Sequence, residues 1–328
     1  MRDIEVVIPA TGDTRSIDVA LSSIRDQTLC PVSVLIVDDG LSNPDAVDQF
    51  GRAIIGAKFR RIPNRGRGIS DALNTGIACC TAPWIARMDA DDRAHPRRFE
   101  FQMRHLESSS ANTLGCGTQV QVYDEHGNSL TPSGYPTEPQ DIARSLLERT
   151  CHAHPSLILR RDSLVRFPYR RALDGAEDVD LVLRLSGHGR VDNLADVLLD
   201  YQIRTGPGAQ RSRPRQTALQ ELAFRLALIR RSGRPDPLDE NPGLAERFVD
   251  WRLSQRGYAP ARRAGTALRY AALAAKAGSP SRAIATLTHG AGIDLLNPAA
   301  WWWLWRIARR SPGALARDQT PFPELALA

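Results

Sequence analysis

Apolar runs and amphipathic stretches alternate along the N-terminal part of the chain. Residues 4–9 (IEVVIP) and 32–40 (VSVLIVDDG) are apolar runs with the length of a buried strand. Between them, residues 16–28 place apolar side chains such as Ile17 and Leu21 at helical spacing. This order predicts a strand–helix–strand unit whose strands are buried on both faces, as in a parallel sheet.

The alternation continues as far as residue 90. The spacing of apolar residues predicts helices over 45–55 and 68–80, and strands over 58–63 and 84–90. Strands that alternate with helices form parallel sheets with helices on both faces. The predicted fold class is therefore α/β, and ligands are expected beyond the carboxyl ends of the strands.

The pattern then becomes mixed and finally helical. Strands are predicted at 118–124 and 156–160, and residues 176–189 (AEDVDLVLRLSGHG) predict a helix that begins at its acidic residues. Residues 204–216 (RTGPGAQRSRPRQ) are rich in Gly, Pro and Arg and predict a loop or linker. Beyond this stretch the sequence predicts only short amphipathic helices, over 217–231, 243–257, 267–278 and 281–290.

These changes predict an α/β domain over residues 1–203, a linker over 204–216 and an all-helical extension over 217–328. The formal net charge is −5 over residues 1–203 and +11 over residues 204–328. A basic C-terminal part favours an anionic partner such as a membrane surface, a polyanionic acceptor or nucleic acid.

Composition narrows the class of protein further. The 328 residues are 42% hydrophobic and 24% charged, which is typical of a globular protein rather than a fibrous, disordered or polytopic membrane chain. The 5 cysteines have no CxxC spacing, so neither a disulfide framework nor a zinc ribbon is predicted. The start MRDIEVVIPA lacks the basic head and apolar core of a secretory signal, so we expect a cytoplasmic protein.

Acidic residues gather where the predicted strands end. Those that follow the strands at 32–40 and 84–90 are Asp38 and Asp39, and Asp89, Asp91 and Asp92. Mg²⁺ and Mn²⁺ prefer oxygen ligands, and Mg²⁺ usually takes one or two carboxylates while substrate phosphates fill other positions. The DADD cluster therefore predicts a Mn²⁺ or Mg²⁺ site.

Two other interpretations of the cluster can be weighed. A calcium EF-hand would use Asp89, Asp91 and Glu100, but arginine occupies ligand positions 93 and 97, and Ala94 stands where the turn needs glycine. The other interpretation, that Asp92 caps the helix predicted in RRFEFQMRHLE, stays open beside the metal site.

Nucleotide-binding motifs of other folds are absent from the sequence. PATGDT follows the first strand, and the chain has neither G-x-G-x-x-G nor G-x-x-x-x-G-K-[ST]. A bound phosphate would therefore be held by metal. A sugar-nucleotide nucleotidyltransferase shares this type of sheet and stays an alternative hypothesis, although PATGDT is not the Gly-rich, Arg/Lys-containing loop that it should carry.

Several segments in order resemble the family 2 glycosyltransferases of the GT-A fold. They are VVIP, SIRDQT, VLIVDDG, NRGRGISDALNTGI, WIARMDADDRAHPRRFEFQ, HPSLILRR and AEDVDLVLRL, and they cover roughly residues 4–203. The resemblance implies a GT-A catalytic domain that binds a nucleotide-diphosphate sugar at its strand ends, with the diphosphate bridged by Mg²⁺ or Mn²⁺.

The resemblance also implies roles for individual residues. Pro9 and Ala10 would lie against the nucleotide, and Asp38 would contact its base, with Asp39 a weaker candidate beside it. Asp89, Asp91 and Asp92 would form the D-x-D-type site for metal and ribose. Asp178 would be the catalytic base, with Glu177 beside it. His154 matches a recurrent family position near the diphosphate or acceptor, or else is a buried and satisfied histidine.

The chemistry of glycosyl transfer agrees with these roles. A metal can stabilise the leaving diphosphate as a Lewis acid, and a carboxylate can deprotonate the acceptor hydroxyl. One base without a second nucleophile gives a single displacement and hence inversion. Asp178 also has a structural interpretation, because an acid in the first helical turn is stabilised by about 0.3 to 1 kcal/mol.

The sequence departs from the family in two places. PATGDT lacks the aromatic residue and asparagine that commonly follow the first strand, and DVDLVLRL lacks the aromatic residues often found after the ED pair. The nucleotide pocket and the stacking of the acceptor are therefore expected to be built differently here.

The basic C-terminal part offers two further features. Arg204, Arg211, Arg213 and Arg215 are either a diphosphate clamp or a solvated linker. Residues 299–310 (AAWWWLWRIARR) predict either contact with the headgroup zone of a membrane or packing onto the core. Their apolar run is too short to span a bilayer, which takes about 20 residues.

The leading hypothesis is an inverting, metal-dependent glycosyltransferase. It would build a cell-surface polysaccharide or glycolipid from the inner face of the plasma membrane, with peripheral contact to anionic lipid. A polyanion-binding or scaffolding protein is the non-enzymatic alternative. No nucleic-acid partner is expected, because aromatic residues are not interleaved with the arginines.

Overall fold

The structure is a computed structural model that describes residues 3–13, 16–124, 126–203, 207–255 and 316–327, and positions 258, 268, 272 and 276. Its contacts divide the chain into two compact units. The first comprises Met1–Val122, Pro132–Ala143 and Thr150–Gln202, and the second comprises Tyr123–Thr131, Arg144–Arg149 and Ile203–Ala328. Two short segments ahead of residue 150 thus group with the C-terminal part, which the sequence does not predict.

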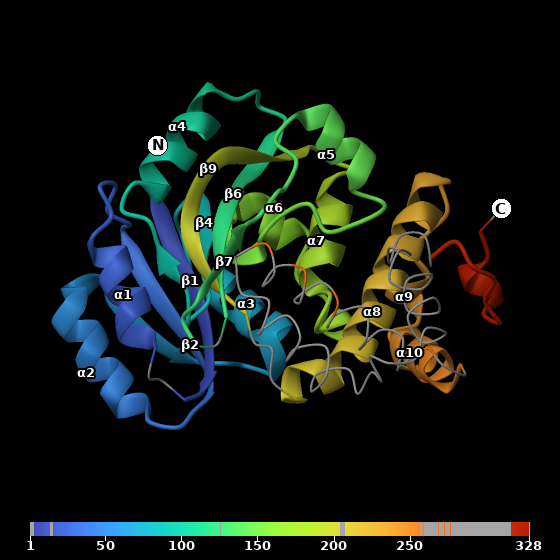
Figure 1. Cartoon of the computed structure of the whole chain (residues 1–328), viewed down its shortest axis with the longest axis horizontal. Coiled ribbons are helices and arrows are strands. Elements are labelled where there is room, and N and C mark those ends of the chain that lie inside the picture. The colour runs from blue at the N-terminus through green and yellow to red at the C-terminus, as the bar shows by residue number, and fades with distance from the viewer. Residues whose placement is uncertain are drawn as a thin grey trace. The chain divides into compact units, whose positions relative to one another are not determined.

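Parallel strands form one half of the sheet in the first unit (Figure 1). β1 (Ile4–Gly12) lies between β2 (Ser33–Leu41) and β4 (Trp84–Arg87), and β3 (Phe59–Pro63) pairs with the far side of β2. The helices along this part of the chain are α1 (Ile17–Arg25), α2 (Pro44–Ile54) and α3 (Gly68–Ala78). The predicted alternation of strands and helices is confirmed here.

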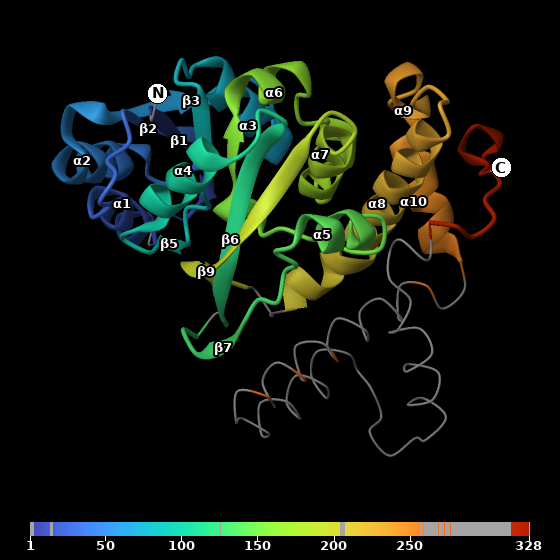
Figure 2. The same cartoon turned by 90° about the horizontal axis from the view of Figure 1, so that it is seen from above.

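The other half of the sheet is mixed. β8 (Ile158–Arg160) runs antiparallel to β4 on one side and to β6 (Thr113–Tyr123) on the other. The order continues with β9 (Arg190–Gln202), which lies beside β6 in Figure 2, and ends with the short β5 (Arg93–Ala94). The sheet is therefore not parallel throughout, because β8 enters between β4 and β6 from the opposite direction.

The remaining elements ahead of residue 190 are short. They are α4 (Arg98–Ser108), β7 (Ser129–Pro132), α5 (Pro139–Ser145), α6 (Arg161–Arg166) and α7 (Glu177–Leu185), with single 3-10 turns at Gly56–Lys58, His154–Ser156 and Arg171–Leu173.

β1 is buried on both faces because its side chains alternate between two layers of helices. Val6 and Ile8 share one buried cluster with Ile17 of α1. Val7 points to the opposite face, where α3 packs. A Cβ at Gly76 of α3 would lie only 2.5 Å from Val7 Cγ1, so glycine permits this close approach of helix and sheet.

Several predicted elements differ from the structure at their ends. The strand predicted at 84–90 ends at Arg87, so DADD lies in the turn beyond it, and the strand predicted at 118–124 begins at Thr113. The stretch 204–216 is not a loop over most of its length, because α8 (Pro207–Arg231) begins at Pro207. Its Gly and Pro residues favour a loop locally, but arginine is a good helix former, and residues 207–216 are helical in the structure.

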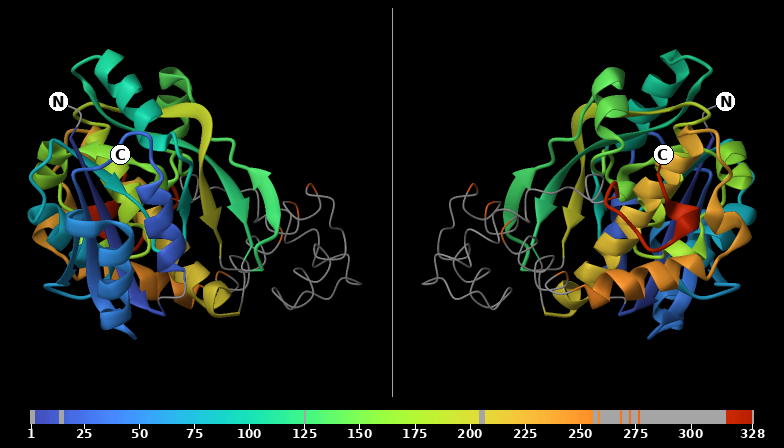
Figure 3. Two further views of the ribbon diagram at one scale, coloured as in Figure 1. Left: turned by 90° about the vertical axis from the view of Figure 1, so that its left-hand side faces the viewer. Right: turned by 90° about the vertical axis from the view of Figure 1, so that its right-hand side faces the viewer.

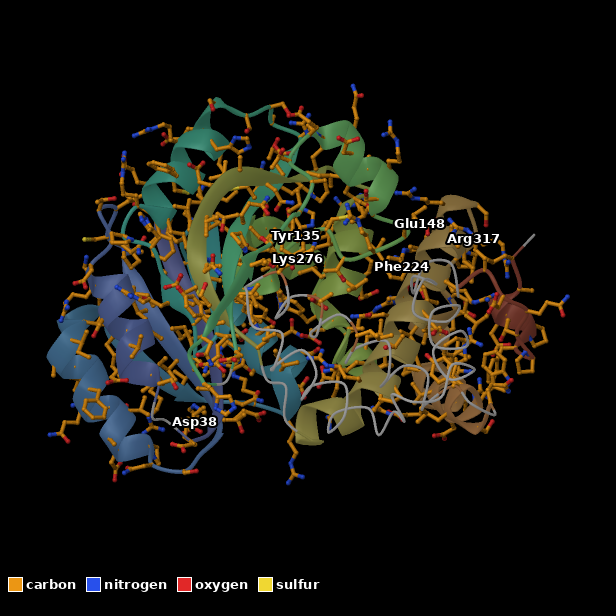
Figure 4. The ribbon with its side chains drawn as sticks, viewed as in Figure 1. Asp38, Tyr135, Glu148, Phe224, Lys276 and Arg317 are labelled. Carbon is orange, nitrogen blue, oxygen red and sulfur yellow. The ribbon has the colours of Figure 1, made fainter. Side chains whose placement is uncertain are left out.

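The second unit is built largely from helices, as the sequence predicts. α8 packs against α10 (Leu244–Ser254), with α9 (Pro237–Glu240) between them in the chain. The segment 316–327 lies alongside these helices in Figure 3, and Arg225 Nη1 of α8 donates a 2.8 Å hydrogen bond to the carbonyl of Leu325. Figure 4 labels Arg317 of this segment beside Glu148, with which it forms an ion pair at 2.7 Å.

No helix among the described residues combines the length and apolar character that a membrane crossing requires. The Trp-rich stretch 299–310 lies outside the described residues, as do the predicted helices over 267–278 and 281–290 apart from three single positions.

Candidate active site

The predicted nucleotide-binding residues lie on two neighbouring strands. Ala10 of β1 is in register with Asp38 of β2, and Pro9 is in register with Val37. Pro9 is partly exposed and Ala10 is buried. The structure therefore brings Pro9, Ala10 and Asp38 together near the carboxyl ends of β1 and β2, where ligands of such sheets bind.

Asp38 is held on both sides of its carboxylate. Its Oδ1 accepts hydrogen bonds from the backbone N–H of Gly40 at 3.0 Å and of Leu41 at 2.8 Å. Its Oδ2 lies 2.8 Å from Arg61 Nη1. The carboxylate thus fixes the turn after β2 and stays partly exposed.

Asp39 fixes the loop that leads into α3. Its Oδ1 accepts a 2.8 Å hydrogen bond from Asn64 Nδ2, and its Oδ2 accepts a 3.0 Å hydrogen bond from the N–H of Gly68. Asp39 therefore ties the end of β2 to the β3–α3 loop.

The DADD residues separate into exposed and buried positions. Asp89 and Asp91 are partly exposed, whereas Asp92 is fully buried. Asp92 Oδ1 accepts a 3.1 Å hydrogen bond from the N–H of Gln202, and its Oδ2 has no hydrogen-bond partner in the part of the chain that the structure describes. Burial raises the pKa of Asp92 well above its ordinary value, and the charge of Asp89 adds to the effect.

The alternative that Asp92 caps a helix is wrong. α4 begins only at Arg98, its cap position is Arg97, and no side chain of a described residue caps it. The Asp92 carboxylate instead reaches the end of β9, a strand that the sequence does not predict.

Asp89 and Asp91 place two partly exposed carboxylates at this turn, where a metal ion could bind. Within residues 3–13, 16–124, 126–203, 207–255 and 316–327, no group of three or more His, Cys, Asp or Glu side chains is placed to hold a metal. Asp89 and Asp91 nevertheless fit a Mg²⁺ or Mn²⁺ ion that takes its other ligands from substrate phosphates. Asp92 is buried and its Oδ1 already accepts a hydrogen bond from the N–H of Gln202, so its role as a metal ligand stays a prediction.

Arg87 lies directly ahead of this cluster and was not predicted as a site residue. Its side chain is 6% exposed and forms an ion pair with Asp89 at 2.6 Å. The Nε and Nη1 atoms of Arg87 have no hydrogen-bond partner among the described residues. A buried charge needs a counter-charge. An arginine in an otherwise apolar strand is therefore the sequence signal that could have marked Arg87 as a site residue.

The ED pair opens α7. Glu177 is buried, and its Oε2 accepts a 2.7 Å hydrogen bond from the N–H of Gly175. Asp178 is partly exposed, and its Oδ1 accepts a 2.8 Å hydrogen bond from the N–H of Val179. Burial, followed by the negative charge of Asp178, raises the pKa of Glu177 to about 8.

Asp178 lies within electrostatic reach of the DADD turn. Burial raises its pKa above the ordinary value, the charge of Arg87 opposes this rise, and the charge of Asp89 adds to it. Arg87, which is ion-paired with Asp89, thus lies within electrostatic range of the predicted base. Asp38 and Asp39 lie on β2, which is separated from β4 by β1.

His154 is a buried and hydrogen-bonded histidine. Its Nε2 is 2.8 Å from Tyr169 Oη, and its Nδ1 is 4.0 Å from Glu177 Oε1. Burial and then the positive charge of Arg87 hold its pKa well below the ordinary value. The imidazole is therefore neutral near pH 7 and lies next to Glu177 of the ED pair.

Two tyrosines near the site also escape prediction. Burial raises the pKa of Tyr135 to about 12, and the charge of Asp178 contributes next. Burial likewise raises the pKa of Tyr201, with contributions from Asp89 and Asp92. Neither tyrosine belongs to a motif, so no local signal in the sequence marks it.

The predicted arginine clamp falls in the second unit. Arg215 of α8 forms an ion pair with Glu246 of α10 at 2.5 Å, and Arg213 Nη1 donates a 3.2 Å hydrogen bond to Gln216. Arg204 and the side chain of Arg211 lie outside the described residues. Arg215 therefore links two helices of its own unit.

Comparison with known proteins identifies the family. Residues 5–166 match the family model described as glycosyl transferase family 2. Over 213 residues the chain is 28% identical to the O-antigen biosynthesis glycosyltransferase WbnJ of Escherichia coli, covering 61% of this chain and 79% of that protein. Over 198 residues it is 29% identical to the amylovoran biosynthesis glycosyltransferase AmsE of Erwinia amylovora, covering 58% and 71%.

Solved structures share the fold. The mannosyltransferase PcManGT from Pyrobaculum calidifontis, in complex with GDP-Man and Mn²⁺, aligns with a TM-score of 0.52 and 19% identity over 95% of this chain and 85% of that one. S. aureus TarS 1-349 in complex with UDP-GlcNAc aligns with a TM-score of 0.56 and 12% identity, over 88% and 89%. The chain is thus a family 2 glycosyltransferase with a GT-A fold and a helical C-terminal part.

Proposed function

We propose that the protein is an inverting, divalent-cation-dependent transferase that moves a sugar from a nucleotide-diphosphate donor to a hydroxyl of a cell-surface polysaccharide or glycolipid. The observation that supports this most is that Arg87, which is ion-paired with Asp89 at 2.6 Å, also lies within electrostatic range of Asp178. It links a carboxylate suited to proton abstraction with the turn suited to a metal and a diphosphate.

Binding of the donor is assigned to the strand ends. Pro9, Ala10 and Asp38 would line the nucleotide, while Asp39 keeps the β3–α3 loop in place through Asn64 and Gly68. Asp89 and Asp91 would hold Mn²⁺ or Mg²⁺. When bound, the ion would offset the negative charge of the leaving diphosphate. A solved structure with this fold is a complex with GDP-Man and Mn²⁺. This complex supports a nucleotide-diphosphate sugar as the donor and a divalent cation as the cofactor.

Asp178 would act as the base. As the acceptor oxygen forms its bond to the anomeric carbon, the bond from that carbon to the diphosphate breaks, and the hydroxyl proton passes to Asp178. A carboxylate whose pKa is raised above its ordinary value is a stronger base. Glu177 is mostly protonated near pH 7, since its pKa is about 8. One ionised carboxylate without a second nucleophile gives inversion.

The names of two relatives support the proposed acceptor class. WbnJ and AmsE are named for the biosynthesis of O-antigen and amylovoran, which are polysaccharides. We propose a glycan or lipid-linked acceptor at the cytoplasmic face of the plasma membrane. The formal charge of +11 over residues 204–328 would favour peripheral contact with anionic lipid.

A donor panel tests this proposal. UDP-, GDP-, dTDP- and CMP-sugars are incubated with the protein and Mn²⁺, and the release of nucleotide and the shift in melting temperature are measured. The sugars of one nucleotide class should raise the melting temperature of the protein and should be turned over with release of the nucleotide. Asp91→Asn should raise the Mn²⁺ concentration for half-maximal rate by at least about tenfold, because one of two carboxylate ligands is lost. Failure of every sugar nucleotide to bind or turn over would refute the function.

A further inference from the structure

Arg87 is the last residue of β4, and both of its backbone groups are hydrogen-bonded. Its N–H donates a 2.9 Å hydrogen bond to the carbonyl of Leu157, and its carbonyl accepts a 2.9 Å hydrogen bond from Arg98 Nη2. The residues on either side of it, Ala86 and Met88, are fully buried. The strand end therefore fixes the backbone from which the Arg87 side chain extends.

Among the described residues, the guanidinium of Arg87 forms an ion pair with Asp89 alone. Arg87 Nη2 lies 2.6 Å from Asp89 Oδ1, whereas Nε and Nη1 are buried and have no hydrogen-bond partner there. Arginine stays protonated inside proteins, and a buried charge that loses its partner is strongly destabilising. The pair of Arg87 and Asp89 is therefore expected to persist, whatever else binds to Asp89.

A second buried arginine adds positive charge beside this pair. Arg98 is fully buried, and besides its bond to the Arg87 carbonyl it donates from Nε to Gln102 Oε1 at 3.2 Å. Its Nη1 has no hydrogen-bond partner in the described part of the chain. Within that part, the two guanidinium groups form one ion pair between them, that of Arg87 with Asp89. The interior next to the DADD turn is therefore rich in positive charge.

Asp89 is also one of the two carboxylates proposed to hold Mn²⁺ or Mg²⁺. Its side chain is 28% exposed, so it contacts Arg87 and remains open to solvent. A cation that takes Asp89 as a ligand would share this carboxylate with the guanidinium, and positive groups so close to each other repel. A nucleoside diphosphate carries the negative charge that offsets this repulsion. The cation should therefore bind more tightly with the diphosphate than without it.

We propose that Arg87 is a positioning residue that acts through Asp89: it holds this carboxylate in the free enzyme and makes the DADD turn take up its divalent cation together with the donor diphosphate rather than ahead of it. The pair also keeps the Asp89 carboxylate in one place, because Arg87 extends from a strand end whose backbone is fixed. A turn without this arginine would bind the cation by itself. The inference rests on the proposed metal and donor site.

Titration with Mn²⁺ followed by electron paramagnetic resonance tests the inference without turnover, because Mn²⁺ in solution gives a sharp signal that is lost on binding. The full chain is titrated alone and with saturating UDP or GDP. The wild type should bind Mn²⁺ at least about tenfold more tightly with nucleotide than without it. Arg87→Met removes the charge and should tighten nucleotide-free binding at least about tenfold, whereas Arg87→Lys keeps the charge and should stay within about threefold.

Arg160→Met is the matched control. Arg160 of β8 is in register with Trp84 at the opposite end of β4 and forms an ion pair with Asp162 at 2.8 Å, so its loss should leave the binding of Mn²⁺ unchanged. The double variant Arg87→Met/Asp89→Asn should bind Mn²⁺ no more tightly than the wild type does, because Arg87 acts through Asp89. Thermal melting checks that each variant folds, and Arg87→Gln takes the place of Arg87→Met if that variant does not.

The inference is overturned if the wild type binds a nucleotide but holds Mn²⁺ equally tightly with and without it, or if the neutral variant leaves nucleotide-free binding unchanged. It is also overturned if Arg87→Lys behaves as Arg87→Met does, or if the double variant binds as tightly as Arg87→Met. Calorimetric binding of UDP and GDP and turnover of their sugars are measured in parallel. The absence of both from the wild type would refute the proposed function, while the nucleotide-free affinities would still decide the role of Arg87.

Discussion

Replacing Glu177 with glutamine should change how the stability of the protein depends on pH. Glu177 is 6% exposed, its Oε2 accepts a hydrogen bond from the N–H of Gly175, and His154 lies 4.0 Å from its Oε1. Burial and the charge of Asp178 raise its pKa from 4.5 to about 8. Glutamine has the shape of the protonated acid and never ionises, so Glu177→Gln removes one titration and little else.

The sign and the size of the effect follow from linkage. Because the native state binds this proton more tightly than the unfolded chain, the stabilising contribution is complete below pH 4.5 and is lost as the pH rises through about 8. The difference between these two pKa values corresponds to a contribution of at most about 5 kcal/mol to the free energy of unfolding. Entry of water into the site would reduce this, so we expect a difference of about 2 to 5 kcal/mol.

Urea denaturation at pH 5, 7 and 9 measures the effect. Wild type and Glu177→Gln should be nearly equal in free energy of unfolding at pH 5, and the variant should be the more stable protein at pH 9. Glu138→Gln replaces an exposed carboxylate and should follow the wild-type curve. Parallel curves for wild type and Glu177→Gln, or a variant that is less stable at pH 9, would refute the assignment of Glu177 as a buried acid.

Two further predictions concern backbone strain and surface charge. Gly68 has φ +84°, and a Cβ there would lie 2.3 Å from Asp174 Oδ2, whereas Gly40 has φ +95° and open space around it. In urea denaturation, Gly68→Ala should therefore lower the free energy of unfolding by about 2 to 4 kcal/mol, and Gly40→Ala should lower it by about 1 to 2 kcal/mol. Equal losses in the two variants would contradict the contact with Asp174. The ion pair of Arg317 and Glu148 joins side chains that are 46% and 43% exposed. Arg317→Met should therefore lower the free energy of unfolding by less than about 1 kcal/mol. A larger loss would show that Arg317 has a role beyond this pair.

The N-terminal half of the sheet could be predicted because its signals are local. Strands β1 and β2 are continuous apolar runs, and the helix between them repeats apolar residues at one spacing. β9 was not predicted, because Asp192, Asn193 and Asp196 interrupt its apolar pattern. Asp192 and Asn193 are nevertheless buried, where their side chains hydrogen-bond to distant parts of the chain.

The candidate site was predictable to a similar extent. The acidic residues at strand ends and the ED pair are visible in the sequence, and Asp178 lies within electrostatic range of Asp89 and Arg87. The buried position of Asp92 was not predictable, because it depends on the end of β9 at Gln202. Tyr135 depends in the same way on hydrogen bonds to Gln119, which lies on another element.

The central claim is that Asp178 removes the acceptor's proton while separate residues hold the donor. The most direct test is Asp178→Asn, with turnover of the preferred sugar nucleotide measured beside calorimetric binding of its nucleoside diphosphate with Mn²⁺. Transfer should fall by at least about 10³-fold, while the dissociation constant changes by less than about threefold. An Asp178→Asn protein that transfers sugar within about tenfold of the wild-type rate would contradict the claim.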